Sequence, residues 1–130
     1  MKKTFLTPLI VLFFIVLSLT IIFGCRKTFY SNRLEKAWKV DSYFKNGVDS
    51  TSNFDIVFKD YVIEFYDNYG YKETYNTLLN QGTWTLTNKS KTLQLTNNGV
   101  VKEYNITKIK DKSLYLVRSE TGEEFHFSPK

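Results

Sequence analysis

The stretch GTWTLTNKSKTLQLTNNG, residues 82–99, indicates the fold most directly. Trp84 and Leu86 alternate with three threonines, and two leucines alternate with polar residues over residues 92–96. Such alternation is typical of a β-strand with one buried face. The turns NKSK and NNG follow these segments, and Asn and Gly readily adopt the positive φ angles that tight hairpins need. The stretch therefore predicts antiparallel strands joined by short turns.

The same pattern continues over the chain from residue 37 onward, with no helical period. The predicted strands cover residues 37–44, 61–66, 71–77, 82–87, 92–96, 100–109, 113–119 and 124–128. Residues 46–53 are expected to form an exposed polar loop. Short strands separated by turn residues are typical of a sandwich or a barrel. A meander of eight such strands closes most simply into an up-and-down barrel without exposed edges. We therefore predict an all-β, eight-stranded antiparallel barrel over residues 37–130.

One face of the predicted strands is rich in large apolar residues. It comprises Trp38, Val40, Phe44, Ile63, Phe65, Tyr71, Tyr75, Trp84, Leu86, Leu93, Leu95, Tyr104, Ile106, Leu114, Leu116, Phe125 and Phe127. A barrel of this size is either filled by its side chains or holds one small ligand, and so many aromatic residues favour a filled interior. Ile106 and Ile109 can both point inward only if a β-bulge lies between them.

Three charged residues also fall on the inward stripes, namely Glu73, Lys102 and Arg118. Charges of mixed sign at one end of a barrel could orient an acidic or zwitterionic ligand. The candidate ligand pocket comprises Trp38, Phe65, Tyr71, Glu73, Trp84, Lys102, Tyr104 and Arg118. Alternatively, the charges lie at strand ends or beyond a bulge, which reverses the facing of a side chain.

The first 24 residues have the features of an export signal. Two lysines precede an uncharged apolar run over residues 5–23, which ends at Gly24 and Cys25. A charged start, an apolar core and a small residue before the cleavage site are typical of a secretory signal peptide. A membrane-spanning helix is the alternative, because the run is about long enough to cross a bilayer. Pro8, several polar residues and the position at the extreme N-terminus favour the signal peptide.

The segment IFGC, residues 22–25, resembles the lipobox of bacterial lipoprotein precursors, although Phe23 stands where a small residue is usual. The resemblance implies a signal peptide over residues 1–24, acylation of Cys25 and anchoring to a membrane, because several acyl chains bind a bilayer far better than one. Residues 25–36 would form the lipidated cysteine and a tether. The basic residues of this tether either contact anionic headgroups or belong to a solvated linker.

In Bacteroidetes-type lipoproteins an acidic patch after the cysteine directs the protein to the cell surface, and residues 26–28, RKT, lack such a patch. The resemblance therefore implies a place in the bacterial cell envelope, anchored in the outer membrane and facing the periplasm. Removal of Lys2 and Lys3 would lower the formal net charge from +5 to +3. That excess is too small to indicate a nucleic acid partner.

The strand pattern as a whole resembles the lipocalin-like domains of small Bacteroidetes lipoproteins. The residues that carry the resemblance are Trp38, IEFYDNYGYKETY at 63–75, GTWTLT at 82–87, LQL at 93–95 and YNITKIKDKSLYL at 104–116. It covers nearly all of the chain after the signal peptide. Its motifs consist of inward apolar residues and turn glycines, so the resemblance implies the barrel but identifies no ligand.

The sequence contains no recognisable catalytic or metal-binding pattern. His126, the single histidine, alternates with two phenylalanines and is expected to point outward. One histidine and a lipidated Cys25 cannot form a common zinc site. We therefore expect no enzymatic activity, metal or cofactor. The segment DST at residues 49–51 resembles the acceptor motif of Bacteroidetes O-glycosylation, with Ser50 as the modified residue.

Two functions of different classes remain open. In the first, a monomeric, membrane-tethered barrel binds a small apolar or amphipathic ligand. In the second, a filled barrel binds another envelope protein through its outer face or loops, as an inhibitor, immunity factor or accessory subunit. A connected apolar cavity would favour the first function, and a packed interior with one large exposed aromatic patch would favour the second.

Overall fold

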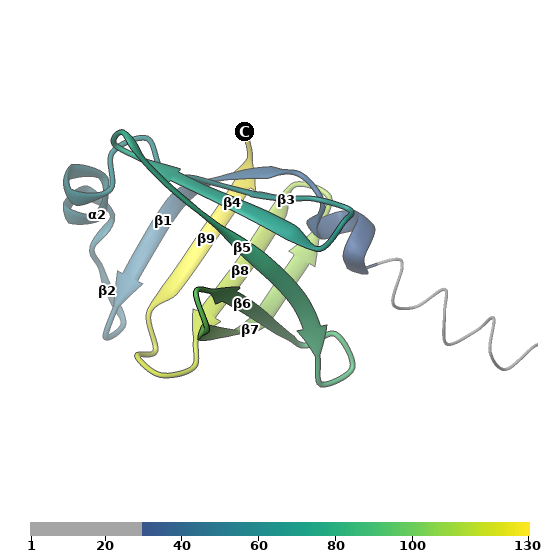
Figure 1. The fold of residues 1–130 in the computed structure, drawn as a ribbon. Coiled ribbons are helices and arrows are strands. Elements are labelled where there is room, and N and C mark those ends of the chain that lie inside the picture. Colours follow the sequence, from purple (N-terminus) through teal and green to yellow (C-terminus); the bar gives the residue numbers. More distant parts are fainter. Residues whose placement is uncertain (1–29) are drawn as a thin grey trace, which may run out of the picture.

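The computed structural model describes residues 30–130, so the predicted signal peptide and Cys25 lie outside the described residues. Eight antiparallel strands follow one another in sequence order: β1 (Ala37–Lys45), β3 (Val62–Phe65), β4 (Gly70–Tyr75), β5 (Leu78–Thr87), β6 (Thr92–Asn97), β7 (Val100–Lys110), β8 (Ser113–Arg118) and β9 (Glu124–Pro129). The last strand also pairs with β1, and the sheet therefore closes into a barrel (Figure 1). The predicted eight-stranded up-and-down barrel is confirmed.

Two short elements between β1 and β3 were not predicted. The strand β2 (Val48–Asp49) pairs with the end of β1, and the helix α2 (Thr51–Val57) follows it. Most of residues 46–53 are exposed, as predicted, but the segment is not an irregular loop throughout, because it contains β2 and the start of α2. A helix of seven residues is too short to show a clear helical period in the sequence.

The barrel has two different ends, which we call the mouth and the base. The mouth carries the β1–β3 connection with α2 and the turns that follow β4, β6 and β8. The base carries the turns that follow β3, β5 and β7, together with the segment before β1 and the end of β9. In Figure 1 the mouth lies on the left and the base on the right.

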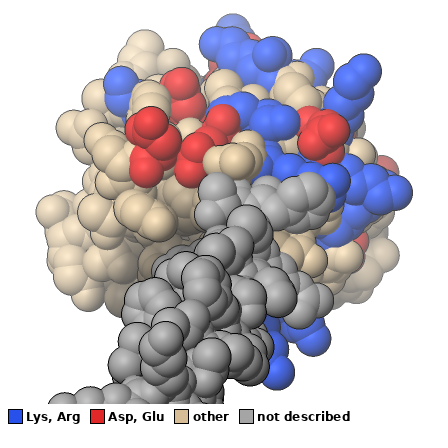
Figure 2. Space-filling model, turned by 90° about the vertical axis from the view of Figure 1, so that its right-hand side faces the viewer, with Lys and Arg blue, Asp and Glu red and all other residues tan. Residues whose placement is uncertain are grey.

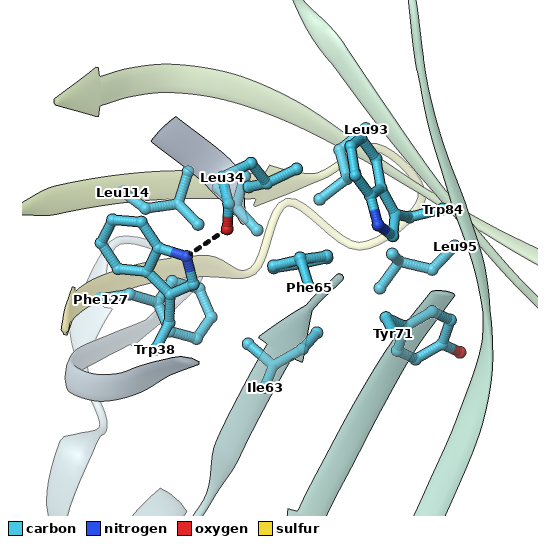
Figure 3. Close-up of a cluster of buried hydrophobic side chains, with 11 residues drawn as sticks. Leu34, Trp38, Ile63, Phe65, Tyr71, Trp84, Leu93, Leu95, Leu114 and Phe127 are labelled. Atoms are coloured by element: carbon cyan, nitrogen blue, oxygen red, sulfur yellow. Dashed lines mark hydrogen bonds between the residues drawn. The ribbon is translucent and has the colours of Figure 1, made fainter. Parts of the chain in front are cut away.

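A short N-terminal segment closes the base. Residues 30–34 are helical, and Leu34 has no exposed surface. The Trp38 indole Nε1–H donates a 2.9 Å hydrogen bond to the Leu34 carbonyl oxygen (Figure 3). Residues 30–34, which belong to the predicted tether, therefore pack against the base of the barrel.

The hydrophobic core fills the base and the middle of the barrel (Figure 3). Its members are Leu34, Trp38, Ile63, Phe65, Tyr71, Trp84, Leu93, Leu95, Leu114, Leu116 and Phe127. All of them except Leu34 belong to the predicted inward face. Full burial of one large apolar side chain stabilises a fold by about 1.5–3 kcal/mol. These core residues and all the paired strands of the described chain lie within residues 34–129, so a fragment of residues 26–130 retains them.

Two β-bulges change which side chains point inward. One lies between Ile106 and Lys108 in the β7–β8 ladder. It lets Ile106 and Ile109 both pack against the core, which confirms the bulge that the sequence predicted.

The other bulge lies between Val40 and Ser42 in the β1–β9 ladder and was not predicted. It turns Tyr43 inward, where 8% of its surface is exposed. Phe44 points outward instead, and its ring centroid lies 5.1 Å from that of His126. The prediction that Phe44 faces the interior is wrong, because an extra residue reverses the alternation beyond it.

Gly82, the first residue of the GTWTLT stretch, occupies a position where a side chain does not fit. A Cβ atom there would overlap the carbonyl oxygen of Thr96 and lie 3.0 Å from the Tyr71 ring. Glycine at this strand position permits the close approach of two backbones. The glycine therefore lets β5 and β6 approach each other beside the core.

Candidate functional site

The eight residues of the predicted pocket do not form one site. Trp38, Phe65 and Trp84 lie in the packed core, each at most 2% exposed. The indole Nε1–H of Trp84 donates a 3.1 Å hydrogen bond to the Tyr66 carbonyl oxygen. None of the three lines either recess described below. Strand alternation predicts the face on which a residue lies, but not its depth along the barrel.

The first recess lies at the mouth, between the β4–β5 and β6–β7 hairpins. It has a volume of about 280 Å³ and is lined by Tyr71, Glu73, Asn80, Leu95, Asn97, Asn98, Val100 and Lys102. Three of these residues, Tyr71, Glu73 and Lys102, belong to the predicted pocket. The strand register brings Glu73 and Lys102 to the same recess, because Glu73 pairs with Asn80 and Lys102 pairs with Leu95. This mouth recess therefore has a carboxylate and an ammonium group on an otherwise partly apolar wall.

The second recess lies at the seam between β1 and β3. These strands share only three residue pairs, from Ala37 with Glu64 to Lys39 with Val62. Beyond these pairs a groove of about 770 Å³ opens, lined by Lys39, Val40, Asp55, Lys59, Asp60, Tyr61, Val62, Thr74, Tyr75, Asn76 and Lys130. The sequence analysis missed this seam groove because it depends on the placement of α2 and on the short β1–β3 ladder. No motif in the sequence marks it.

Tyr61 and Glu73 connect the two recesses. Tyr61 lines the seam groove and Glu73 lines the mouth recess, and the two side chains lie close enough to interact electrostatically. Burial, and then the negative charge of Glu73, raises the pKa of Tyr61 well above its ordinary value. The phenol therefore stays protonated, and a ligand in either recess would contact one member of this pair.

Arg118 and Tyr104 lie on another part of the mouth. They face each other across the β7–β8 ladder. Arg118 forms ion pairs with Glu120 and Glu123, at nitrogen–oxygen distances of 3.5 and 3.8 Å. Its Nε is buried and has no hydrogen-bond partner among the described residues. An unsatisfied buried donor costs about 1–3 kcal/mol.

Glu123 joins this cluster to the inward-turned Tyr43. The Tyr43 hydroxyl donates a 2.6 Å hydrogen bond to Glu123 Oε1. This bond is the largest effect that lowers the pKa of Glu123, and Thr121 and Arg118 act in the same direction. Burial raises the pKa of Tyr43 to about 12, with help from its bond to Glu123. Burial also raises the pKa of Tyr104 to about 12.

The helix α2 covers one side of the mouth with aromatic packing. The Phe54 ring centroid lies 4.9 Å from that of Tyr43 and 5.5 Å from that of Tyr61. Phe125, from β9, lies 5.1 Å from Tyr43 and 6.0 Å from the core residue Phe127. A continuous series of aromatic rings therefore extends from α2 into the core and fills this side of the interior. The described recesses lie at the rim and the seam.

The rim of the mouth exposes a group of aliphatic side chains, each at least half exposed. The group, which we call the aliphatic rim, comprises Val48, Ile56, Val57, Leu78, Leu79, Val100 and Val101. They come from β2, from α2 and from the hairpins beside the mouth recess. Gathered exposed apolar residues mark interaction sites more often than scattered ones. The sequence analysis expected an aromatic patch for a protein-binding function, whereas this rim is aliphatic.

His126 lies on the outer wall, as predicted. Its ring stacks on Tyr115 at a centroid distance of 3.7 Å, and its Nε2 lies 2.6 Å from Glu124 Oε1. Over residues 30–130 no group of His, Cys, Asp and Glu side chains is arranged to hold a metal ion. Ser50 lies in the turn before α2, where its hydroxyl donates to the Val48 carbonyl oxygen. Its glycosylation stays a prediction.

Comparison with known proteins defines the fold. No family model matches the sequence, and no curated protein matches it. A lipocalin-like protein from Bacteroides uniformis superimposes with a TM-score of 0.61 at 10% identity, covering 75% of this chain and 99% of that chain. A DUF4847 family protein from Bacteroides vulgatus superimposes with a TM-score of 0.50 at 12% identity, covering 74% of this chain and 93% of that one.

At such identities the likeness concerns the fold alone. The protein has a lipocalin-like barrel, and the resemblance inferred from its strand pattern is confirmed at this level. Within residues 30–130 no helix has the length and hydrophobicity needed to span a membrane.

Proposed function

We propose that the protein is a lipid-anchored barrel of the bacterial cell envelope that binds a small amphipathic ligand at its mouth. The mouth recess carries the proposal, because it places Glu73 and Lys102 beside the apolar surfaces of Tyr71, Leu95 and Val100. Its volume of about 280 Å³ lies just below the usual range for ligand sites, about 300–1,000 Å³. The recess therefore suits a head group better than a whole ligand.

The surroundings of the recess indicate how the remainder of such a ligand would bind. Val100 lines the recess and is 61% exposed, and Val101 follows it on the rim. Leu79, 52% exposed, adjoins Asn80 on the opposite hairpin. A ligand with a zwitterionic or otherwise polar head group and an apolar tail matches this arrangement, since the head can pair with Glu73 and Lys102 while the tail covers the exposed side chain of Val100.

The proposed anchor agrees with the direction of the barrel. The described chain begins at the base, and the mouth lies at the opposite end. A protein tethered through Cys25 would keep its mouth accessible. We propose acylation of Cys25, an outer-membrane position facing the periplasm, a monomeric state, and no enzymatic or nucleic acid-binding activity.

Native mass spectrometry of residues 26–130 after incubation with envelope extract tests ligand binding. We expect a bound small molecule that is lost on activation. The variants Glu73→Gln and Lys102→Gln should weaken binding at least about tenfold, since a charge-assisted hydrogen bond contributes about 1.5–3 kcal/mol. The matched control is Lys72→Gln, because Lys72 lies beside Glu73 in β4 but on the outer face of that strand. Only apo protein, or a ligand retained equally by all variants, would contradict the proposal.

The aliphatic rim favours a second candidate function, which is binding of another envelope protein. Leu79→Asp and Val101→Asp should then abolish retention of the partner, because a buried unpaired charge in an interface is strongly unfavourable. Glu73→Gln should leave the partner bound. The opposite pattern, in which only the recess variant has an effect, would exclude the rim as the binding surface. These three variants therefore separate the two functions in one pull-down experiment with a crosslinker.

A further inference from the structure

Most charged residues of the described chain lie near one end of the barrel or the other, and Lys39, Asp41, Glu64, Lys72 and Glu103 lie along its wall. The base carries Arg33, Lys36, Lys89, Lys91, Lys108, Lys110, Lys112 and Lys130, with Glu35, Asp67 and Asp111 among them. The mouth carries Asp49, Asp55, Asp60, Glu73, Glu120, Glu123 and Glu124, with Lys45, Lys59, Lys102 and Arg118 among them. The base is therefore basic and the mouth acidic, and the protein has a charge dipole along the barrel axis.

Four basic residues of the base, Arg33, Lys89, Lys91 and Lys108, border one groove. This groove has a volume of about 510 Å³ and is lined by Tyr30, Arg33, Lys89, Ser90, Lys91, Ile106, Thr107, Lys108 and Ile109. Figure 2 shows this end of the barrel, with Lys and Arg side chains over its upper and right-hand parts and acidic side chains beside and between them. The N-terminal segment, the β5–β6 turn and the end of β7 contribute to the groove, so the feature depends on the folded barrel.

Several contacts fix these basic groups. The Arg33 Nη1 donates a 3.2 Å hydrogen bond to the Ile109 carbonyl oxygen, and its Nε lies 3.6 Å from Asp111 Oδ1. The Lys108 Nζ lies 4.7 Å from the centre of the Tyr115 ring. Lys89 and Lys91, in contrast, lie exposed on the β5–β6 turn. The base therefore combines fixed cations with long, exposed lysines that can follow an uneven charged surface.

We propose that this basic base lies against the anionic surface of a lipid bilayer and so directs the mouth away from the membrane. The point where the chain enters the fold supports a bilayer as the partner. Tyr30 is the first described residue, and five residues from Cys25 to Tyr30 span at most about 18 Å. This part of the argument depends on the proposed anchor at Cys25, whereas the charge dipole does not.

Both ends of the dipole favour the same orientation. Lysines near an anionic leaflet are attracted to it within about one Debye length, which is about 8 Å at physiological salt. The acidic mouth is repelled by the same surface. The base is also closed by Leu34 and Trp38, so contact with a membrane there does not block the mouth recess.

Binding of residues 26–130 to vesicles tests the proposal without the anchor. The protein is sedimented with vesicles of phosphatidylcholine alone or with added phosphatidylglycerol. The base variant combines Lys89→Glu, Lys91→Glu and Lys112→Glu. The control variant combines Lys45→Glu, Lys59→Glu and Lys72→Glu, which change the net charge equally but lie on the mouth and the wall. Circular dichroism and thermal melting of each variant establish that it is folded.

We expect binding only to the anionic vesicles, and weaker binding when the ionic strength rises from about 0.01 to about 0.15 M. The base variant should lose at least about tenfold in affinity and the control variant less than about threefold. Equal losses in both variants, or equal binding to both vesicle types, would overturn the proposal. Competition by inorganic phosphate beyond that of chloride at equal ionic strength would also overturn it, because it would indicate a site for a free phosphate.

Failure of this experiment is distinguishable from failure of the proposed function. Ligand binding depends on Glu73 and Lys102, which both variants retain. Acylation of Cys25 is measured separately on protein isolated from bacterial membranes, as a mass above that of residues 25–130.

Discussion

The base and the mouth of this barrel are built from the same alternating strands, yet they differ in every other respect. At the base, Leu34, Trp38 and Leu114 have no exposed surface, and the surrounding turns are basic. At the mouth, inward positions carry Glu73, Lys102 and polar tyrosines, and the rim exposes aliphatic side chains. The base therefore holds fully buried packing, whereas the mouth holds the polar and exposed side chains of the proposed binding site.

The largest effect on stability is expected at the base. Trp38→Ala removes a fully buried indole and its hydrogen bond to Leu34, and such replacements cost about 3–5 kcal/mol. Urea unfolding followed by circular dichroism should show the loss. A cost below about 1 kcal/mol would mean that the N-terminal segment does not close the base in solution.

A smaller loss is expected where β5 approaches β6. Gly82→Ala places a methyl group against the Thr96 carbonyl oxygen and the Tyr71 ring, and overpacking of this kind costs about 1–3 kcal/mol. Thr83→Ala, at the next and exposed position, is the matched control and should change stability by about 0.5 kcal/mol or less. Equal unfolding midpoints for both variants would show that β5 and β6 can move apart at Gly82 at little cost in free energy.

Acid should affect the mouth through Glu123, whose pKa is lowered in the folded state by the Tyr43 hydroxyl. Its contribution to stability is therefore fully present above the unfolded-state pKa, about 4.3. It is lost as the pH falls through the lower folded-state pKa. Thermal melting across this range should show a flatter pH dependence for Glu123→Gln than for the wild type. Glu120→Gln, at a side chain that is 74% exposed, should follow the wild type.

Alkali should also lower the stability of the fold, through Tyr43 and Tyr104. Both have a pKa of about 12 in the fold, against about 10 in an unfolded chain. Their contribution is present below pH 10 and is lost as the pH rises through about 12. Tyrosinate absorbance should rise in two stages, and Tyr104→Phe should reduce the later one. A single stage near pH 10 in the folded protein would contradict burial of these phenols.

The smallest effect is expected on the aliphatic rim. Leu79 is 52% exposed, so Leu79→Ser should change the free energy of unfolding by about 0.5 kcal/mol or less. A loss of ligand or partner binding without a loss of stability would identify the rim as a binding surface. A large destabilisation would instead show that the rim belongs to the core.

Much of the barrel could be predicted from the sequence, because strand alternation and turn residues are local properties. The bulge near Thr107 was predictable as well, since Ile106 and Ile109 cannot otherwise share a face. The bulge after Val40 was not, because both Tyr43 and Phe44 are aromatic and either could point inward. The helix α2 was equally hidden, because its single buried anchor, Phe54, depends on Tyr43 and Phe125 from distant strands.

The sequence by itself determined the eight barrel strands, their antiparallel order, most of the inward face and the presence of Glu73, Lys102 and Arg118 on that face. Only the tertiary structure decided how deep each inward residue lies. It buried Trp38 and Trp84, grouped Glu73 with Lys102, and placed Arg118 with Glu123 elsewhere on the mouth. Alternation along a strand has a period of two and defines two faces, whereas depth, seams and charged ends arise only when the strands close on one another.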